Sequence, residues 1–455
     1  MMAQTVYLLD AIQLLTEYLS RILCRRVFQK VKTTERRRRW TLYHLAWFWV
    51  AVAVKAPPGL TAVLGMIQRQ KVKLYPRVKA TPVAFFKRCQ KFRWIFFAEL
   101  YRGLLAEMLP IAPTVYAKAI EGIRARFGDI WVIDGSRLDK VMRRLKILWK
   151  RRSVILPGCL TAYYDVSRGI IRELSFFADA AKAEMVRALE TVACVPAGTL
   201  LMGDRLYGVP RFFAELGDRG IFGLFRRNKV VKLKQVLVLS RWIGSRCLLE
   251  DILVEAGGQQ GTPKVTLRWI RYRHGSLRLD LVTNILDQKQ LSAKEAVELY
   301  RWRWSVERLF FDLKEVLHLN RLYASSPNAV AMQVYGAAMV HLAFRIAQGR
   351  IAKEHNVEPE QISPKKLFGW LAEASVNYVM VEMSFDLAEA LNPGVTLKRP
   401  TRRHRVAGYQ TTLEQILVRP RIGRGRKRRF CAERRRWKSF KHIPGGRKFC
   451  EVPTP

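Results

Sequence analysis

The sequence is poor in acidic residues and its cysteines are not paired. Its 455 residues contain 37 Asp and Glu against 81 Lys and Arg, which gives a formal net charge of +44. The seven cysteines are scattered, and no two of them form a Cys-x-x-Cys pair. Their odd number and wide spacing fit neither a disulfide framework nor a cysteine-based zinc site. A reducing, cytosolic compartment is therefore the predicted location.

The chain also lacks a long hydrophobic run. Its most apolar stretch, residues 40–54, is 15 residues long and contains His44, whereas a membrane-spanning helix needs about 20 residues. We predict a buried helix there and no membrane partner. An acidic residue interrupts the apolar N-terminal stretch and no basic segment precedes it, so we expect no signal peptide.

The excess of positive charge is far larger than solubility requires. Self-repulsion at this charge destabilises a compact monomer, and a polyanionic partner relieves it. Nucleic acid is the usual partner of so basic a chain, and an anionic membrane surface or a histone-like packaging role are the alternatives. The hydrophobic content of 49%, with 12 Trp, 15 Tyr and 22 Phe, argues against general disorder and for a sizeable core.

Composition and periodicity divide the chain into five parts. Residues 1–125 read as a helical, basic, DNA-binding domain, and residues 126–228 as the first part of an α/β core with short apolar strands. Residues 229–285 hold successive strands without helices, which predicts a β-rich insertion. Residues 286–395 return to helix as the second part of the core, and a capping box at its start favours this. Residues 396–455 form a basic tail, typical of segments that order only on meeting an anion.

Two acidic residues stand at the ends of predicted strands. Asp134 ends the apolar run 129–134, and Asp204 ends the apolar run 199–204. Ligands of α/β sheets gather beyond the carboxyl ends of strands. If these strands are parallel neighbours, the two carboxylates lie side by side, and a divalent cation such as Mg²⁺ offsets their repulsion. Each aspartate alone is as well explained as a turn residue.

A further acidic residue lies on a helix predicted over roughly residues 293–319. Tyr300, Arg303, Glu307 and Lys314 are spaced so that a regular α-helix presents them on nearly one face. A carboxylate flanked by phosphate-binding groups suits a nuclease, because Arg binds phosphate with two hydrogen bonds and Lys acts as a point charge. A surface helix stabilised by ion pairs is the alternative interpretation.

Together, Asp134, Asp204 and the Tyr-Arg-Glu-Lys spacing resemble the DDE transposases of bacterial insertion sequences, in the branch named for that tetrad (insertion-sequence family four). The resemblance covers about residues 125–345. It implies an α/β, ribonuclease-H-like, mixed-sheet catalytic core interrupted by a β-rich insertion, with a helical N-terminal domain and a basic C-terminal tail. It also implies that Asp134, Asp204 and Glu307 are catalytic and bind two Mg²⁺ ions, with Mn²⁺ as a substitute.

The resemblance further implies DNA contacts. The phosphates of the transposon end would be bound by Tyr300, Arg303, Lys314 and Arg205. Some members of the family use a tryptophan of the insertion to hold a flipped base. Trp242 and Trp269 are the candidates here, the sequence does not choose between them, and a core position is the alternative for either.

The implied reaction is a series of displacements at phosphorus. Hydrolysis at the transposon end frees a 3′-hydroxyl, this hydroxyl forms a hairpin, the hairpin is reopened, and the 3′ end joins target DNA. A homodimer on double-stranded DNA in the bacterial nucleoid is expected, because excision requires two paired ends. A nuclease of the same fold that joins no strands, and a catalytically decayed DNA-binding protein, are the alternatives.

Overall fold

The computed structural model describes residues 5–7, 10–69, 74–138, 158–245, 247–259, 261–324, 326–369, 410–412 and 417. Most of the predicted basic tail therefore lies outside the described residues. The chain divides into two compact units. Unit 1 contains the described residues of 1–116, 135–184 and 306–418, and unit 2 contains those of 117–134 and 185–305. The predicted domain boundaries stay a prediction.

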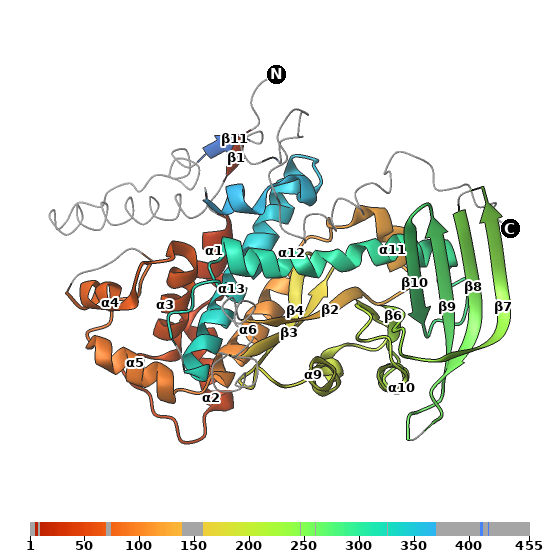
Figure 1. Cartoon of the computed structure of the whole chain (residues 1–455). Coiled ribbons are helices and arrows are strands. Elements are labelled where there is room, and N and C mark those ends of the chain that lie inside the picture. Colours follow the sequence, from red (N-terminus) through yellow and green to blue (C-terminus); the bar gives the residue numbers. More distant parts are fainter. Residues whose placement is uncertain are drawn as a thin grey trace. The chain divides into compact units, whose positions relative to one another are not determined.

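Unit 1 is built mainly from helices (Figure 1). Its longer helices are α1 (Asp10–Tyr18), α2 (Arg21–Val31), α3 (Leu42–Lys55), α4 (Leu60–Arg69), α5 (Pro82–Lys91), α6 (Ile95–Met108) and α13 (Pro327–Glu354). Short 3₁₀ turns are η1 (Leu109–Ile111) and η7 (Pro359–Gln361). A serine or threonine hydroxyl accepts a backbone N–H at the start of α2, α3, α5 and α13, which satisfies donors that the first turn leaves unpaired.

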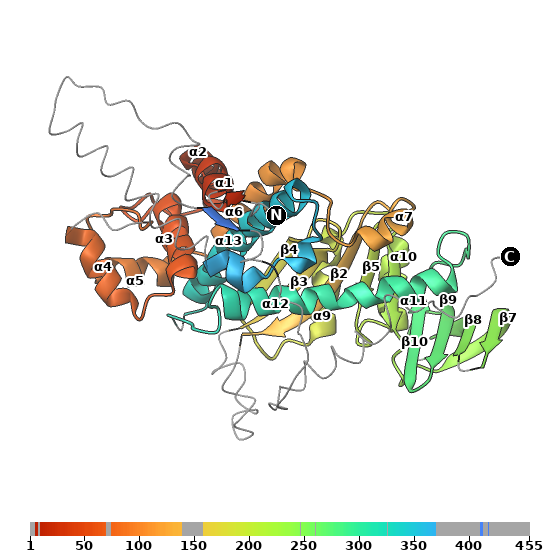
Figure 2. The same cartoon turned by 90° about the horizontal axis from the view of Figure 1, so that it is seen from above.

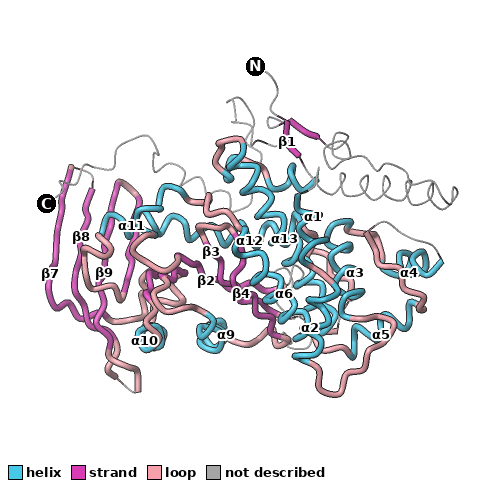
Figure 3. The backbone as a smooth tube through the Cα atoms, turned by 180° about the vertical axis from the view of Figure 1, so that it is seen from behind, coloured by secondary structure: helices cyan, strands magenta, loops and turns pink. Residues whose placement is uncertain are grey.

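Helix α13 is the centre of unit 1. It packs against α1, α3, α5, α6 and strand β4 (Ile170–Phe177), and Figure 3 shows it among the helices of this unit. Gly336 permits the approach of α3, because a Cβ there would lie 2.8 Å from the Cβ of Trp49. Among the described residues α13 alone is long and apolar enough to cross a membrane, and its apolar window is wholly buried. The apolar run 40–54 forms the buried helix α3, as predicted.

Unit 1 also contains two antiparallel strand pairs. β3 (Cys159–Asp165) pairs with β4, and the turn between them is held by Asp165, whose carboxylate accepts the backbone N–H groups of Ser167 and Arg168. Gly169 ends this turn with φ at +68°, a conformation that favours glycine. β1 (Thr5–Tyr7) pairs with β11 (Gln410–Thr412), a contact that the sequence did not predict.

Unit 2 contains a parallel group of strands. β2 (Ile130–Arg137), β5 (Leu200–Gly203) and β6 (Phe222–Arg226) pair in that order. β2 passes from unit 2 to unit 1 after Asp134, and its neighbour on the other side is β3. The helical elements around these strands are η2 (Lys118–Ile120), α7 (Glu121–Arg124), α9 (Glu184–Thr191), η4 (Val192–Cys194) and α10 (Pro210–Asp218).

The β-rich segment continues this sheet. Its strands are β7 (Leu233–Gly244), β8 (Cys247–Ala256), β9 (Val265–His274) and β10 (Leu277–Thr283). They pair antiparallel as β7-β8-β9-β10, side by side in Figure 2. β10 also pairs antiparallel with β6, which Figure 1 labels. The strands were predicted, and the mixed α/β architecture is confirmed. Their order shows that they extend the sheet of parallel strands instead of forming a separate layer.

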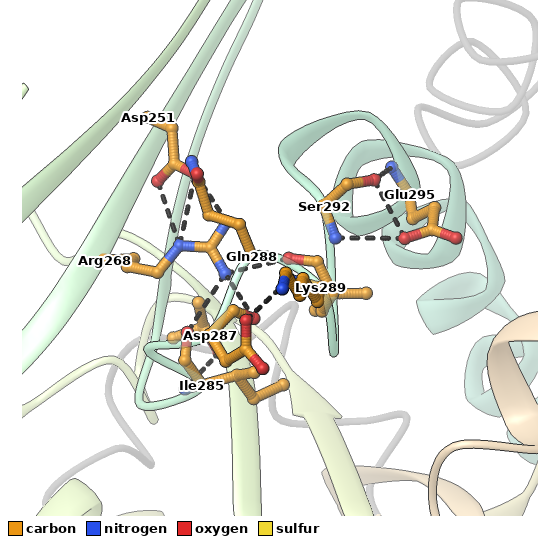
Figure 4. A network of polar contacts seen from close by, with 10 residues as sticks. Asp251, Arg268, Ile285, Asp287, Gln288, Lys289, Ser292 and Glu295 are labelled. Carbon is orange, nitrogen blue, oxygen red and sulfur yellow. Dashed lines mark hydrogen bonds and ion pairs between the residues drawn. The ribbon is translucent and has the colours of Figure 1, made fainter. Parts of the chain in front are cut away.

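A buried ion pair fixes these strands to the start of helix α11 (Ala293–Tyr300). The guanidinium of Arg268 donates to the carboxylate of Asp251, and both side chains are fully buried. Arg268 also donates to the carbonyls of Ile285 and Leu291, and Gln288 donates to Asp251 (Figure 4). The buried charges are thus paired and hydrogen-bonded, which offsets much of the cost of removing them from water. The chain that enters α11 is therefore held in one path.

The helix predicted over residues 293–319 is not regular. After α11 come a 3₁₀ segment, η5 (Arg301–Trp304), then α12 (Ser305–Phe311), then a π-helical turn, η6 (Asp312–Val316). The premise of one regular α-helix is therefore wrong, and the common face of Tyr300, Arg303, Glu307 and Lys314 that was inferred from it stays a prediction. Helical periodicity in the sequence cannot distinguish these forms, because the choice among i→i+3, i→i+4 and i→i+5 bonds is decided by tertiary contacts.

Candidate active site

The two strand-end aspartates stand on neighbouring parallel strands. β2 and β5 pair Ile130 with Leu200 and Val132 with Met202. Extended by two residues, this register puts Asp134 level with Asp204, the residue that directly follows β5. β2 itself continues past Asp134 to Arg137, so the prediction that Asp134 ends its strand is wrong by three residues, because Gly135 and Ser136 continue the strand instead of forming a turn. Residues opposite each other in parallel strands project from the same face of the sheet. The condition on which the sequence argument depended, that these two strands are adjacent and parallel, is met.

The end of β2 is also contacted by a side chain of the π turn. The Lys314 ammonium donates to the Ser136 hydroxyl at 2.6 Å, within unit 1. Ser136 lies two residues beyond Asp134, and alternation along a strand places these two side chains on the same face. Lys314 thus identifies the face of β2 from which Asp134 projects. The sequence did not predict the contact between Ser136 and Lys314.

Gly135 lies between these two residues, and its neighbour is acidic. A Cβ at Gly135 would lie 2.8 Å from the carboxylate Oε1 of Glu184, at the start of α9. The absence of a side chain therefore lets Glu184 approach the backbone of β2. Nothing in the sequence marks Glu184, because its proximity depends on how α9 packs against the strand.

The end of β5 is contacted by Tyr300. Its hydroxyl donates to the carbonyl of Gly203 at 3.0 Å, one residue before Asp204. Burial raises the pKa of Tyr300 well above its usual value, the Arg303 charge acts against this shift, and the Asp204 carboxylate adds to it. The hydroxyl of Tyr300 is thus neutral, and its only proton is engaged by a backbone oxygen.

The two predicted phosphate-binding arginines differ in exposure. Arg303 is buried, and its guanidinium lies 4.4 Å from the centre of the Trp304 ring. Arg205 is exposed, and its backbone N–H donates to the Asp204 carboxylate at 2.7 Å. The Arg205 side chain is therefore accessible to an anion, whereas Arg303 is packed against an aromatic ring.

Glu307 lies in the first turn of α12, which belongs to unit 1, whereas Asp134 and Asp204 belong to unit 2. In the part of the chain that the structure describes, no group of three or more His, Cys, Asp or Glu side chains is arranged to hold a metal ion. The chemistry of the aspartate pair fits Mg²⁺, which prefers carboxylate oxygen. The assignment of the three carboxylates as metal ligands stays a prediction.

The two candidate tryptophans have different surroundings. Trp269 on β9 is half-buried, with the guanidinium groups of Arg227 and Arg271 at 4.3 and 4.9 Å from its ring centre. Its indole N–H donates to Asp280. Trp242 lies on β7, opposite Leu249 of β8, and is also half-buried. Neither is part of the fully buried core, so the choice between them stays open.

The chain is similar to known transposases over part of its length. Residues 160–343 match the family model described as "Transposase DDE domain". This match includes Asp204 and Glu307 but begins after Asp134, whose candidacy rests on the pairing of β2 with β5.

Curated relatives agree with this match. The chain is 32% identical over 136 residues to a "Putative transposase for insertion sequence element IS4SA" from Synechocystis, covering 28% of this chain and 39% of that protein. It is 24% identical over 178 residues to a "Probable transposase for insertion sequence element IS5377" from Geobacillus stearothermophilus, covering 36% and 46%. The chain thus spans less than half the length of these relatives. The predicted resemblance to DDE transposases is confirmed; membership of the Tyr-Arg-Glu-Lys branch stays a prediction.

A solved structure, "Cryo-EM structure of piggyBac transposase synaptic complex with hairpin DNA", aligns with 92% of this chain and 87% of its own, at 11% identity and a TM-score of 0.36. A similarity at this level supports no argument about fold or mechanism.

Proposed function

We propose that this protein is a DNA transposase that cuts the ends of its own insertion sequence and joins them to target DNA. The observation that carries the proposal is the parallel pairing of β2 with β5, whose register, extended by two residues, puts Asp134 of β2 level with Asp204, the residue after β5. The match of residues 160–343 to the transposase DDE domain supports it. In this proposal the core is ribonuclease-H-like and the tetrad is that of insertion-sequence family four.

Asp134, Asp204 and Glu307 are the proposed catalytic carboxylates. Two bound Mg²⁺ ions would supply an activated water or 3′-hydroxyl and stabilise the leaving oxygen of the displacement. The carboxylates of Asp134 and Asp204 hold negative charge at the strand ends, where a cation is attracted and nearby basic groups bring phosphate. One set of residues serves hydrolysis, hairpin formation and strand joining, because each is the same displacement with a different nucleophile.

The basic residues around the strand ends are the proposed DNA contacts. Lys314 supplies a point charge at Ser136, and the exposed Arg205 follows Asp204 directly. Arg303 is packed on Trp304 and so offers a fixed guanidinium. Tyr300 acts through the backbone of β5 in this structure, because its proton is donated to Gly203. The net charge of +44 favours binding to DNA. In this proposal the protein acts in the bacterial nucleoid, as a homodimer on the two paired ends.

The test is a cleavage assay on labelled duplexes taken from the two flanks of the gene. We expect Mg²⁺-dependent cleavage that frees a 3′-hydroxyl, followed by joining to a second duplex. Asp134→Asn, Asp204→Asn and Glu307→Gln are each expected to lower cleavage by at least about 10³-fold while DNA binding persists. Asp129→Asn, at the opposite end of β2, is the matched control and is expected to cleave normally.

Other outcomes select the alternatives. Cleavage without strand joining would identify a nuclease of the same fold. Binding without cleavage, in the presence of Mg²⁺ or Mn²⁺, would identify a decayed DNA-binding protein. Loss of DNA affinity in Glu307→Gln would make Glu307 a structural residue.

A further inference from the structure

The turn that holds Lys314 is a π turn, not a continuation of α12. The N–H of Leu317 donates to the carbonyl of Asp312 at 2.8 Å, an i→i+5 bond. The N–H of Asn320 donates to the carbonyl of Lys314 at 3.1 Å, and His318 adopts a left-handed φ of +58°. π turns are rare in proteins as a whole, and those that occur are often found at functional sites. A short turn of this kind persists only where its surroundings determine it.

Buried polar groups lie under this turn. The Asp312 side chain is 5% exposed and the His341 side chain on α13 is 1% exposed, with His341 Nε2 3.8 Å from Asp312 Oδ2. In the described part of the chain neither ring nitrogen of His341 has a hydrogen-bond partner. The two groups therefore make a close polar contact that is not optimised as a hydrogen bond.

Two arginines complete the surroundings of Asp312. Burial, and then the charge of Arg345, lower the pKa of Arg308, while Asp312 is among the groups that act in the opposite direction. Arg345 on α13 is buried, and its guanidinium donates to the Gly169 carbonyl and the Tyr164 hydroxyl. Asp312 is thus a buried carboxylate among cationic and neutral polar groups, all of them within unit 1.

The same turn also carries Lys314, whose half-buried side chain donates to Ser136. Because an i→i+5 bond takes one more residue into the turn than an α-helix does, it changes the direction in which the side chains of the turn project. A relaxation of residues 312–316 to α-helix would therefore redirect the Lys314 ammonium away from its present direction. The position of Lys314 depends on whatever holds the π turn.

We propose that Asp312 and His341 are positioning residues, which hold the π turn at Asp312–Val316 and thereby keep the Lys314 ammonium at the end of β2. The inference rests on the proposed function, in which that ammonium aligns a phosphate of the DNA. It extends that function to two buried residues that touch neither the strand ends nor DNA. It also gives the π turn a role, which is to direct the Lys314 side chain.

The test is a double-mutant cycle with Lys314. Asp312→Asn and His341→Gln are each made in the wild-type and in the Lys314→Ala protein, and cleavage of the flank duplexes is measured. We expect about a tenfold loss of cleavage rate in the wild-type background and less than about a twofold change in the Lys314→Ala background, because residues that act through one group are not additive. An equal loss in both backgrounds would overturn the proposal and leave only a structural role.

Tyr335→Phe is the matched control. It removes another buried polar contact of α13, the bond from the Tyr335 hydroxyl to the carbonyl of Leu174, away from the π turn. Its effect on cleavage, whatever its size, is expected to be the same in both backgrounds.

Hydrogen exchange separates this inference from the proposed function. The amides of Leu317 and Asn320 close the turn, so Asp312→Asn and His341→Gln should each speed their exchange at least about tenfold relative to Tyr335→Phe. Unchanged protection would overturn the proposal even if cleavage fell. A wild-type protein that cleaves no DNA would overturn the proposed function and the role of Lys314, while the exchange rates would still decide whether the pair holds the turn.

Discussion

Each unit contains a buried arginine, and the two are satisfied differently. In unit 2, Arg268 faces the carboxylate of Asp251 and donates its remaining protons to backbone carbonyls. In unit 1, Arg345 donates to a carbonyl, a phenol and an amide, and none of these partners is charged. The network around Arg268 pairs its buried charges and holds the β-rich strands in place. The network around Arg345 adjoins the turn that bears Lys314, where His341 has no hydrogen bond in the described structure.

The difference indicates that the two networks have different roles, one in the scaffold and one near the candidate site. A buried charge that is fully paired makes a rigid scaffold, because any rearrangement would expose it unpaired. A polar group whose bonds are incomplete stores some free energy in the folded state, and such groups are concentrated where geometry serves a reaction. The following substitutions sharpen this contrast, and the first is expected to have the largest effect.

Arg268→Met should destabilise the protein by about 3–5 kcal/mol, because it leaves the Asp251 carboxylate buried without its counter-ion. Urea unfolding of the wild-type and variant proteins measures this difference. Replacing both partners, as Arg268→Met with Asp251→Leu, should recover a large part of the loss. A single variant within about 0.5 kcal/mol of wild type would contradict the scaffold role.

Arg345→Met should cost less, about 1–3 kcal/mol, because its lost partners are neutral groups. The same urea titration applies, and Gln348→Met is a useful comparison, since it removes one of those partners from the same helix. If Arg345→Met cost as much as Arg268→Met, the contrast between the two networks would be lost.

His341 should make the protein less stable in acid. Burial lowers its pKa, with Asp312 acting in the opposite direction, so the folded state favours the neutral ring. The unfolded chain takes up a proton near the ordinary histidine pKa of about 6.5. The stability due to the neutral ring is therefore present above that pH and is lost as the pH falls below it. We expect a fall in melting temperature between pH 7 and pH 5 that is smaller in His341→Gln; equal falls would assign the effect to other groups.

Lys264→Met should have the smallest effect. Lys264 precedes β9 and pairs with Glu255 at 2.9 Å, but its own side chain is 62% exposed. Exposed ion pairs contribute little because water screens them. No change in the urea midpoint is expected, and a clear loss would show that the surface pairs of this sheet matter as well.

The sequence predicted the strands well. The runs that end at Asp134 and Asp204, and the four strands after residue 229, appear at nearly the expected positions, because short apolar runs bounded by turn residues have few other ways to be buried. It left open whether these two strands are parallel neighbours, and it ended the first strand at Asp134, whereas β2 continues to Arg137. It did not predict that the β-rich strands join the sheet of β6, because local periodicity does not determine which distant strands pair.

The helix of the tetrad marks the limit of such reasoning. Residues 293–316 are helical as expected, and the capping box at Ser292 begins the helix as predicted. The 3₁₀ and π segments within it were not predictable, because the choice among these helical forms depends on tertiary contacts that local periodicity does not reveal.

By itself the sequence determined a basic chain with an α/β core, carboxylates at two strand ends and the resemblance to DDE transposases. Charge, apolar runs and turn residues are local properties, and each limits the fold without reference to distant parts of the chain. Only the tertiary structure decided that β2 pairs in parallel with β5, that Lys314 reaches Ser136, and that the buried pair of Asp312 and His341 lies beneath its turn. Register, burial and the form of a helical turn depend on residues far apart in the chain, and packing alone brings those residues together.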